Sequence, residues 1–178
     1  MGTDSWQNLV EMFFGQASRL GDAPMLWQKE EGVYQSASWR EVAEDVARLA
    51  WSLEQAGVEA GDRVVIVSES RREWVIADLA IMAAGGISVP TYITNTTRDH
   101  THILENSGAK AAVVSTRRLA RALLPAAHES DSLQTAICME PPNISQSLNV
   151  DIVLWEEAIN NSQGEVADYE ARAKEISR

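Results

Sequence analysis

Hydroxyl and amide side chains gather in one short segment, directly after the apolar residues 87–90: Thr91, Tyr92, Thr94 and Asn95. Pro90 stops strand pairing just before them. In an open α/β sheet, ligands bind beyond the carboxyl ends of the strands. We therefore predict that these four side chains line part of a substrate channel.

A structural interpretation of the same segment stays open. Thr96, followed three residues later by Asp99, suits the N-cap of a helix, and hydroxyl side chains are typical of turns. A second segment of the same rim, "SESRR" at residues 68–72, follows the strand that we expect to end at Val67.

Other reactive residue types form no recognisable catalytic or metal-binding pattern. His100 and His102 fall on nearly opposite sides of an expected helix, so we interpret both as solvent-exposed. His128, near a helix end, is explained by contact with the helix C-terminus. Nucleophile elbows, Walker A loops, Gly-x-Gly-x-x-Gly and His-Glu-x-x-His are absent. We assign no catalytic, cofactor-binding or metal-binding residue.

Composition restricts the classes of partner. Of 178 residues, 45% are hydrophobic and 23% charged, as in a soluble globular protein. A net charge of -11 disfavours nucleic acid and anionic membrane surfaces. The longest apolar run is interrupted by Asp78 and a glycine pair, so contact with a membrane is expected to be at most peripheral. Cys138 is the only cysteine, which fits a reducing, cytoplasmic location.

Apolar periodicity predicts the elements that must position the candidate segments. We expect helices at residues 6–20, 39–56, 71–84, 98–106 and 117–129, the last of which Pro125 could break. A hairpin with its turn at Glu31-Gly32 is expected within residues 23–38, and strands near residues 64–67, 87–90, 109–116, 133–140 and 150–155. Capping boxes are predicted at Ser38 with Glu41 and at Ser70 with Glu73.

This alternation predicts a layered α/β fold, with a mostly parallel sheet and helices on both faces. We assign residues 1–161 to an α/β subdomain. Residues 162–178 are expected to form a polar tail with too few apolar residues to anchor itself.

Two phrases, "ASWREV" and "IMAAGGISVP", occur here in an order and spacing that resemble the N-terminal part of AMP-forming acyl-CoA synthetases. The longer stretches around them, including "HILENSGAKAAVVST", are most similar to long-chain fatty acid-CoA ligases. The resemblance implies the N-terminal portion of the large domain of an adenylate-forming enzyme. Such enzymes use ATP and magnesium to convert a carboxylic acid to an acyl-adenylate, and then transfer the acyl group to coenzyme A.

The family's phosphate loop, adenine-side motif, ribose-binding Asp and catalytic Lys have no counterpart in these residues. The resemblance therefore implies a fragment of a fatty acid-CoA ligase that is inactive alone and binds ATP, magnesium or coenzyme A no more than weakly. The alternative is a stand-alone, non-catalytic α/β binding or interaction module. Because the family's sheets continue further, we also expect an exposed sheet edge through which copies could associate.

Overall fold

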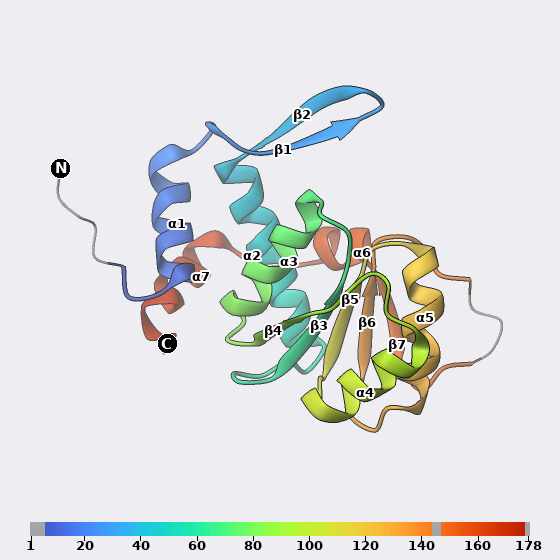
Figure 1. Cartoon of the computed structure of the whole chain (residues 1–178). Coiled ribbons are helices and arrows are strands. Elements are labelled where there is room, and N and C mark those ends of the chain that lie inside the picture. Colours follow the sequence, from blue (N-terminus) through green and yellow to red (C-terminus); the bar gives the residue numbers. More distant parts are fainter. Residues whose placement is uncertain (1–5, 144–146, 177–178) are drawn as a thin grey trace.

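The computed structural model describes residues 6–143 and 147–176, which form a parallel sheet between helical layers and a projecting hairpin (Figure 1). The N-terminal elements are α1 (Leu9–Leu20), β1 (Pro24–Glu30), β2 (Val33–Ser38) and α2 (Trp39–Gln55). The sheet and its crossovers follow as β3 (Arg63–Val67), α3 (Arg72–Ala83), β4 (Ile87–Pro90), α4 (Thr97–Ser107), β5 (Ala111–Val114), α5 (Arg117–Glu129), β6 (Thr135–Cys138) and β7 (Asp151–Leu154). The last elements are α6 (Trp155–Asn160), α7 (Val166–Arg172) and the 3-10 turn η1 (Ala173–Glu175).

The central sheet has the strand order β4-β3-β5-β6-β7, and every neighbouring pair is parallel. Alternate residues of β3 enter two different cores. Val64 and Ile66 pack on the side of α1, α2 and α3, whereas Val65 and Val67 pack on the side of α4 and α5. The predicted layered α/β class, with helices on both faces, is confirmed.

Helix α2 begins with the predicted capping box. The Ser38 backbone N–H donates to Glu41 at 2.7 Å, and the Glu41 N–H donates back to the Ser38 hydroxyl at 3.2 Å. Behind this cap the buried side of the helix includes Leu49 and Leu53, both fully buried. Two orphan N–H groups are thus satisfied where the chain leaves the hairpin and enters the core.

The second predicted capping box, at Ser70 and Glu73, is wrong. The N-cap of α3 is Arg71, which makes no side-chain cap hydrogen bond. The Glu73 carboxylate instead accepts from the Arg71 guanidinium at 2.7 Å and 3.1 Å. A charged donor two residues away competes better for the carboxylate than a backbone N–H does.

Gly85 and Gly86 close α3 as their position predicts. Gly85 has a φ of +80°, in the left-handed region that favours glycine. A Cβ on Gly86 would lie 3.1 Å from the Ile81 Cγ2 and 3.2 Å from the Asp62 carbonyl oxygen. The pair therefore both ends the helix and lets it pack closely beside β3.

Helix α5 runs from Arg117 to Glu129 without a break at Pro125. The side chain of Pro125 is exposed, whereas its neighbours Leu124 and Ala126 are buried. Packing of that apolar side against the sheet outweighs the loss of one backbone hydrogen bond.

The C-terminal segment is anchored, contrary to the expectation of an unanchored tail. Tyr169 and Ala173 are only 3% and 0% exposed, in the same core as α1 and α2. The Tyr169 hydroxyl donates to Glu54 at 3.0 Å, and Arg172 forms an ion pair with Glu54 at 2.7 Å. Two buried side chains and one shared carboxylate are enough to hold this short C-terminal segment.

Candidate functional site

The carboxyl ends of β3 and β5 form the topological switch point of the sheet. The chain leaves β3 for α3 on one face and leaves β5 for α5 on the other, so the two connections diverge at neighbouring strands (Figure 1). In open α/β sheets this crevice is where ligands bind. It is therefore the first place to look for chemistry.

A three-residue polar cluster occupies this point. The Ser115 hydroxyl, fully buried, donates to the Glu69 carboxylate, and Arg118 lies 3.3 Å from the other oxygen of that carboxylate. Burial raises the pKa of Glu69, but the hydrogen bond from Ser115 and the contact with Arg118 outweigh it, so the net shift is downward. Glu69 is thus an ionised acceptor that ties the loop after β3 to the start of α5.

Neighbouring charged side chains of the rim also form hydrogen bonds within the chain. The Glu140 carboxylate accepts from the Arg117 backbone N–H at 2.8 Å, at the N-terminus of α5. The Arg117 guanidinium donates to the Pro141 carbonyl at 2.9 Å. Because the Glu140 carboxylate and the Pro141 carbonyl already accept from these donors, Arg117 holds the loops of the rim in place and its bonded N–H groups are not free to bind a phosphate.

The segment of channel candidates lies on the same rim, after β4. Both the N–H and the hydroxyl of Thr91 donate to the Ile66 carbonyl, at 2.9 Å and 3.3 Å. Asn95 is half-buried, and its N–H donates to the Tyr92 carbonyl at 3.1 Å. Thr94 is exposed, and Tyr92 is 80% exposed. The segment is thus fixed to the sheet at one end and presents the side chains of Tyr92, Ile93 and Thr94 to solvent.

The capping interpretation of this segment also holds. Thr96 and Asp99 form a capping box: the Thr96 N–H and hydroxyl each donate to the Asp99 carboxylate at 2.8 Å. These hydrogen bonds lower the pKa of Asp99. Thr96 is therefore structural, and only the residues before it remain candidates for ligand contact.

His100 is not solvent-exposed as predicted, whereas His102 is. His100 is 1% exposed, and neither ring nitrogen has a hydrogen-bond partner. It lies one turn before the buried Leu104, on the same side of α4. Burial without a partner lowers the pKa of His100, so the ring is neutral at pH 7.

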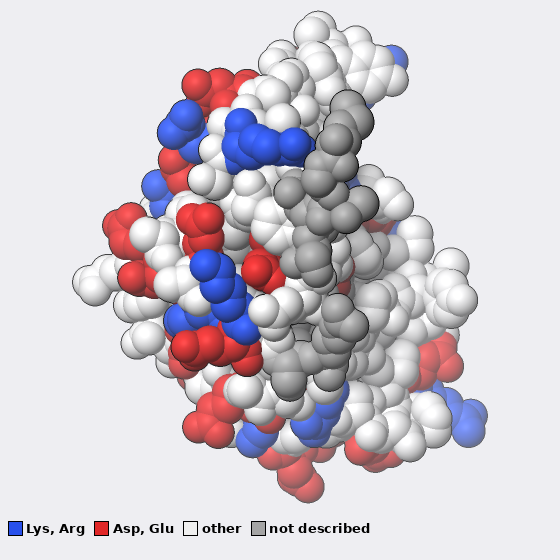
Figure 2. Space-filling model, turned by 90° about the vertical axis from the view of Figure 1, so that its left-hand side faces the viewer, with Lys and Arg blue, Asp and Glu red and all other residues white. Residues whose placement is uncertain are grey.

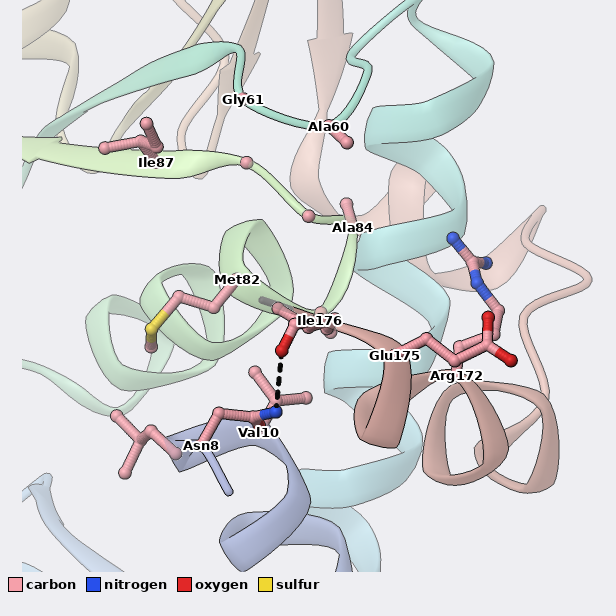
Figure 3. Close-up of a pocket in the computed structure, with 14 residues that line it drawn as sticks. Asn8, Val10, Ala60, Gly61, Met82, Ala84, Ile87, Arg172, Glu175 and Ile176 are labelled. Carbon is pink, nitrogen blue, oxygen red and sulfur yellow. Dashed lines mark hydrogen bonds between the residues drawn. The ribbon is translucent and has the colours of Figure 1, made fainter. Parts of the chain in front are cut away.

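A cavity of about 730 Å³ lies at the opposite, amino end of β3 and β4. Its walls come from the start of α1, the turn after α3 and the C-terminal segment, and Asn8 donates across it to the Ile176 carbonyl at 3.1 Å (Figure 3). Arg172 extends away toward α2, consistent with its ion pair with Glu54. The lining is mainly apolar and holds no pair of reactive side chains, so this cavity gives no evidence of catalysis.

The remaining charges are dispersed. On the face formed by α1 and α7, acidic and basic side chains are mixed, without an extended basic patch (Figure 2). Within residues 6–143 and 147–176, no group of three or more His, Cys, Asp or Glu could hold a metal ion. Across those same residues, no helix is both long and apolar enough to cross a bilayer.

Comparison with known proteins explains this combination of an ordered sheet and an incomplete site. The model of the family described as "AMP-binding enzyme" matches residues 13–171. The chain belongs to this family. As the resemblance predicted, it corresponds to an N-terminal part of such an enzyme.

Two relatives of this chain are named as ligases of long-chain fatty acids. The chain is 40% identical over 102 residues to the long-chain-fatty-acid--CoA ligase FadD15 of Mycobacterium tuberculosis, covering 57% of this chain and 17% of the relative. It is 31% identical over 112 residues to the long-chain-fatty-acid--CoA ligase of Salmonella typhimurium, covering 62% and 19%. The aligned part of this chain therefore covers less than a fifth of the length of each of these two relatives.

Solved structures show the same fold. The benzoate CoA ligase of Burkholderia xenovorans superposes with a TM-score of 0.72 at 23% identity, covering 88% of this chain and 29% of the other. The five-stranded sheet and its helices are thus those of the large domain of adenylate-forming enzymes.

The sequence indicated the "SESRR" segment as part of the rim but not its partner Ser115. The sequence shows that this segment directly follows a buried strand. It does not show that β3 and β5 are neighbours in the sheet, which is what brings Ser115 to Glu69.

Proposed function

We propose that this chain is the N-terminal part of an ATP-dependent long-chain fatty acid-CoA ligase. The full reaction would join a fatty acid to AMP with release of pyrophosphate, and then transfer the acyl group to coenzyme A. The observation that carries the proposal is the 40% identity to a long-chain-fatty-acid--CoA ligase within an AMP-binding family match. In this proposal residues 6–176 supply scaffold and no reacting group.

Binding of ATP, magnesium and coenzyme A falls mainly to residues outside this chain. The hydrogen bonds of the rim support this proposal. The Ser115 hydroxyl already donates to Glu69 and the Arg117 N–H already donates to Glu140, so neither donor is free to bind a phosphate. We expect that the chain alone does not bind these ligands tightly.

A comparison of two proteins tests the proposal: this chain, and the longer protein read in frame from the same gene. With ATP, magnesium, coenzyme A and palmitate, the longer protein should release pyrophosphate and form palmitoyl-CoA, and the chain alone should not. Turnover by the chain alone would contradict the division of labour. A natural stop codon after Arg178, or a longer protein without palmitate-dependent turnover, would favour the non-catalytic module.

Within that ligase we propose that Thr91, Tyr92, Thr94 and Asn95 line part of the acyl channel. Exposure of Tyr92 and Thr94 on the carboxyl rim supports this role. In the longer protein, Tyr92→Ala with Thr94→Ala should raise the KM for palmitate by about tenfold, a loss typical of a few apolar contacts, and leave the KM for ATP unchanged. Gln163→Ala, at an exposed position outside the rim, is the matched control. Equal KM values in all three proteins would exclude the segment from the channel.

We also propose a cytoplasmic location and self-association through a sheet edge. Burial raises the pKa of the single thiol, Cys138, to about 11, so it stays protonated, as suits a structural cysteine in a reducing compartment.

In the described residues β7 pairs only with β6, which leaves its other edge open. Concentration-dependent light scattering should show oligomers, and a monomer at all concentrations would exclude this contact.

A further inference from the structure

The first half of α4 and the rim segment before it lie between two anchors. At one end, both the N–H and the hydroxyl of Thr91 donate to a carbonyl of β3. At the other end, Leu104 is buried, and the Arg63 guanidinium donates to the Ser107 carbonyl at 2.6 Å, at the C-terminus of α4. The residues between these anchors, 92–103, are here named the rim flap.

One side chain holds the rim flap to the core. Among residues 92–103, His100 alone is buried. It lies one turn before Leu104, so its ring points into the core that the sheet shares with α4 and α5 (Figure 1). Ile103 is only partly buried against the same core. Packing of the rim flap on the sheet therefore depends mainly on one imidazole.

The environment of this imidazole favours its neutral form. Neither ring nitrogen has a hydrogen-bond partner among the described residues. The neighbouring Asp99 carboxylate attracts a proton to the ring, but it is exposed and already accepts from Thr96. Burial of an unpartnered imidazolium costs more than this attraction returns, so the pKa of His100 is lowered.

The other titratable groups on the elements packed here do not compensate for an imidazolium. The Cys138 thiol of β6 lies on the same face, and burial raises its pKa to about 11, so it is neutral. His128, in the last turn of α5, accepts from the Asn149 N–H. The side chains that β3, β4 and β5 turn to this core are valines and alanines: Val65, Val67, Val89, Ala112 and Val114. The remaining charged or titratable side chains of α4 and α5 are exposed: Arg98, His102, Glu105, Arg117, Arg118, Arg121 and Glu129.

We propose that His100 is a pH-sensitive latch: its neutral ring holds the rim flap on the sheet, and protonation releases the flap while the sheet stays folded. A released ring would be hydrated and close to the Asp99 carboxylate, so the open state binds a proton more tightly than the closed state does. Protons therefore shift the population toward the open state as pH falls below about 6.5, the ordinary pKa of histidine.

Release of the rim flap would displace Tyr92 and Thr94, two of the side chains that we propose for the acyl channel. The latch itself does not depend on that function, because every group in it belongs to the described residues of this chain.

Hydrogen–deuterium exchange of the whole chain from pH 7.5 to pH 5, with rates corrected for the intrinsic pH dependence of amide exchange, tests the latch. Amides of residues 97–103 should be less protected than those of β3. About 1 M urea should leave their protection unchanged, because local opening exposes little surface. Below about pH 6.5 their protection should fall about tenfold for each pH unit, until the folded-state pKa is reached. His100→Leu should abolish this dependence, and His102→Leu, at an exposed position of α4, should keep it.

Three results would overturn the proposal. The first is amides of the rim flap that share the protection and the urea dependence of β3, since His100 would then titrate only on global unfolding. The second is a pH dependence that persists in His100→Leu, and the third is one that His102→Leu also abolishes. His100→Gln, which is uncharged at every pH but keeps a polar side chain, should behave as His100→Leu does. Circular dichroism spectra that match the wild type show that each variant is folded.

Discussion

Two sets of helices cover the two faces of the parallel sheet, and they differ in how they treat polar groups. On the face of α2 and α3 the buried side chains are apolar, apart from groups such as the Tyr169 hydroxyl, which is paired with Glu54. On the face of α4 and α5 the imidazole of His100 is buried without any partner. The first face resembles an ordinary close-packed core, whereas the second contains one group whose charge state matters. We therefore expect pH to act on the second face.

The largest effect should come from a cavity on the first face. Leu49→Ala removes a fully buried side chain from the middle of α2, and should cost about 2–5 kcal/mol of unfolding free energy. Urea denaturation at pH 5.5 and at pH 8 should give the same loss, because the side chain that is removed does not titrate. A loss that depends on pH would show that the two faces are coupled.

His100→Leu should act in the opposite direction. Removing two unpartnered ring nitrogens from the core should stabilise the chain by roughly 1–3 kcal/mol at neutral pH. The folded-state pKa of His100 lies below its unfolded-state value, so the unfolded chain takes up the proton first. Wild-type stability should therefore fall as pH drops below about 6.5, and this component should be absent from the variant. His102→Leu, at an exposed position of α4, is the control.

Glu69→Gln probes the rim that joins the two faces. The change removes a charge that accepts from Ser115 and Arg118, and should cost about 1 kcal/mol, a value reduced by partial exposure. Because the pKa of Glu69 is lowered in the folded chain, its contribution is present above the unfolded-state pKa and is lost as pH falls through the folded value. Urea titrations from pH 7 to pH 3 should show the variant and the wild type converging. Curves that stay parallel would assign no electrostatic role to Glu69.

The smallest expected effect on stability concerns the N-termini of α2 and α3, both on the first face. Ser38→Ala should cost about 1 kcal/mol through loss of the capping box. Ser70→Ala should have no measurable effect, since α3 makes no side-chain cap bond. Thermal unfolding of both variants checks the pair, and equal shifts would contradict the assignment of Arg71 as the N-cap.

Local patterns in the sequence predicted most helices and strands, because each depends on neighbours along the chain. Buried runs such as residues 64–67 and the cap at Ser38 are examples. The strand order β4-β3-β5 was not predictable, since it depends on contacts between distant segments. The sequence also did not predict the burial of His100. Helix α4 is short and mostly polar, and its buried residues are only His100 and Leu104, so the apolar pattern is too weak to show which side packs against the sheet. Of the candidate site, sequence supplied the rim segments but not the pairing of Glu69 with Ser115.

The contact between Asn8 and the C-terminal turn has a consequence for synthesis on the ribosome. The Asn8 amide donates to the carbonyls of Ala173 and Ile176, so the start of α1 is completed by residues made 165 and 168 positions later. Contacts between such distant positions form late, after local helices and hairpins. Helix α1 must therefore wait, with part of its apolar side uncovered, until almost the whole described chain has emerged. Chaperones that recognise apolar helices would have their longest opportunity to bind at this segment.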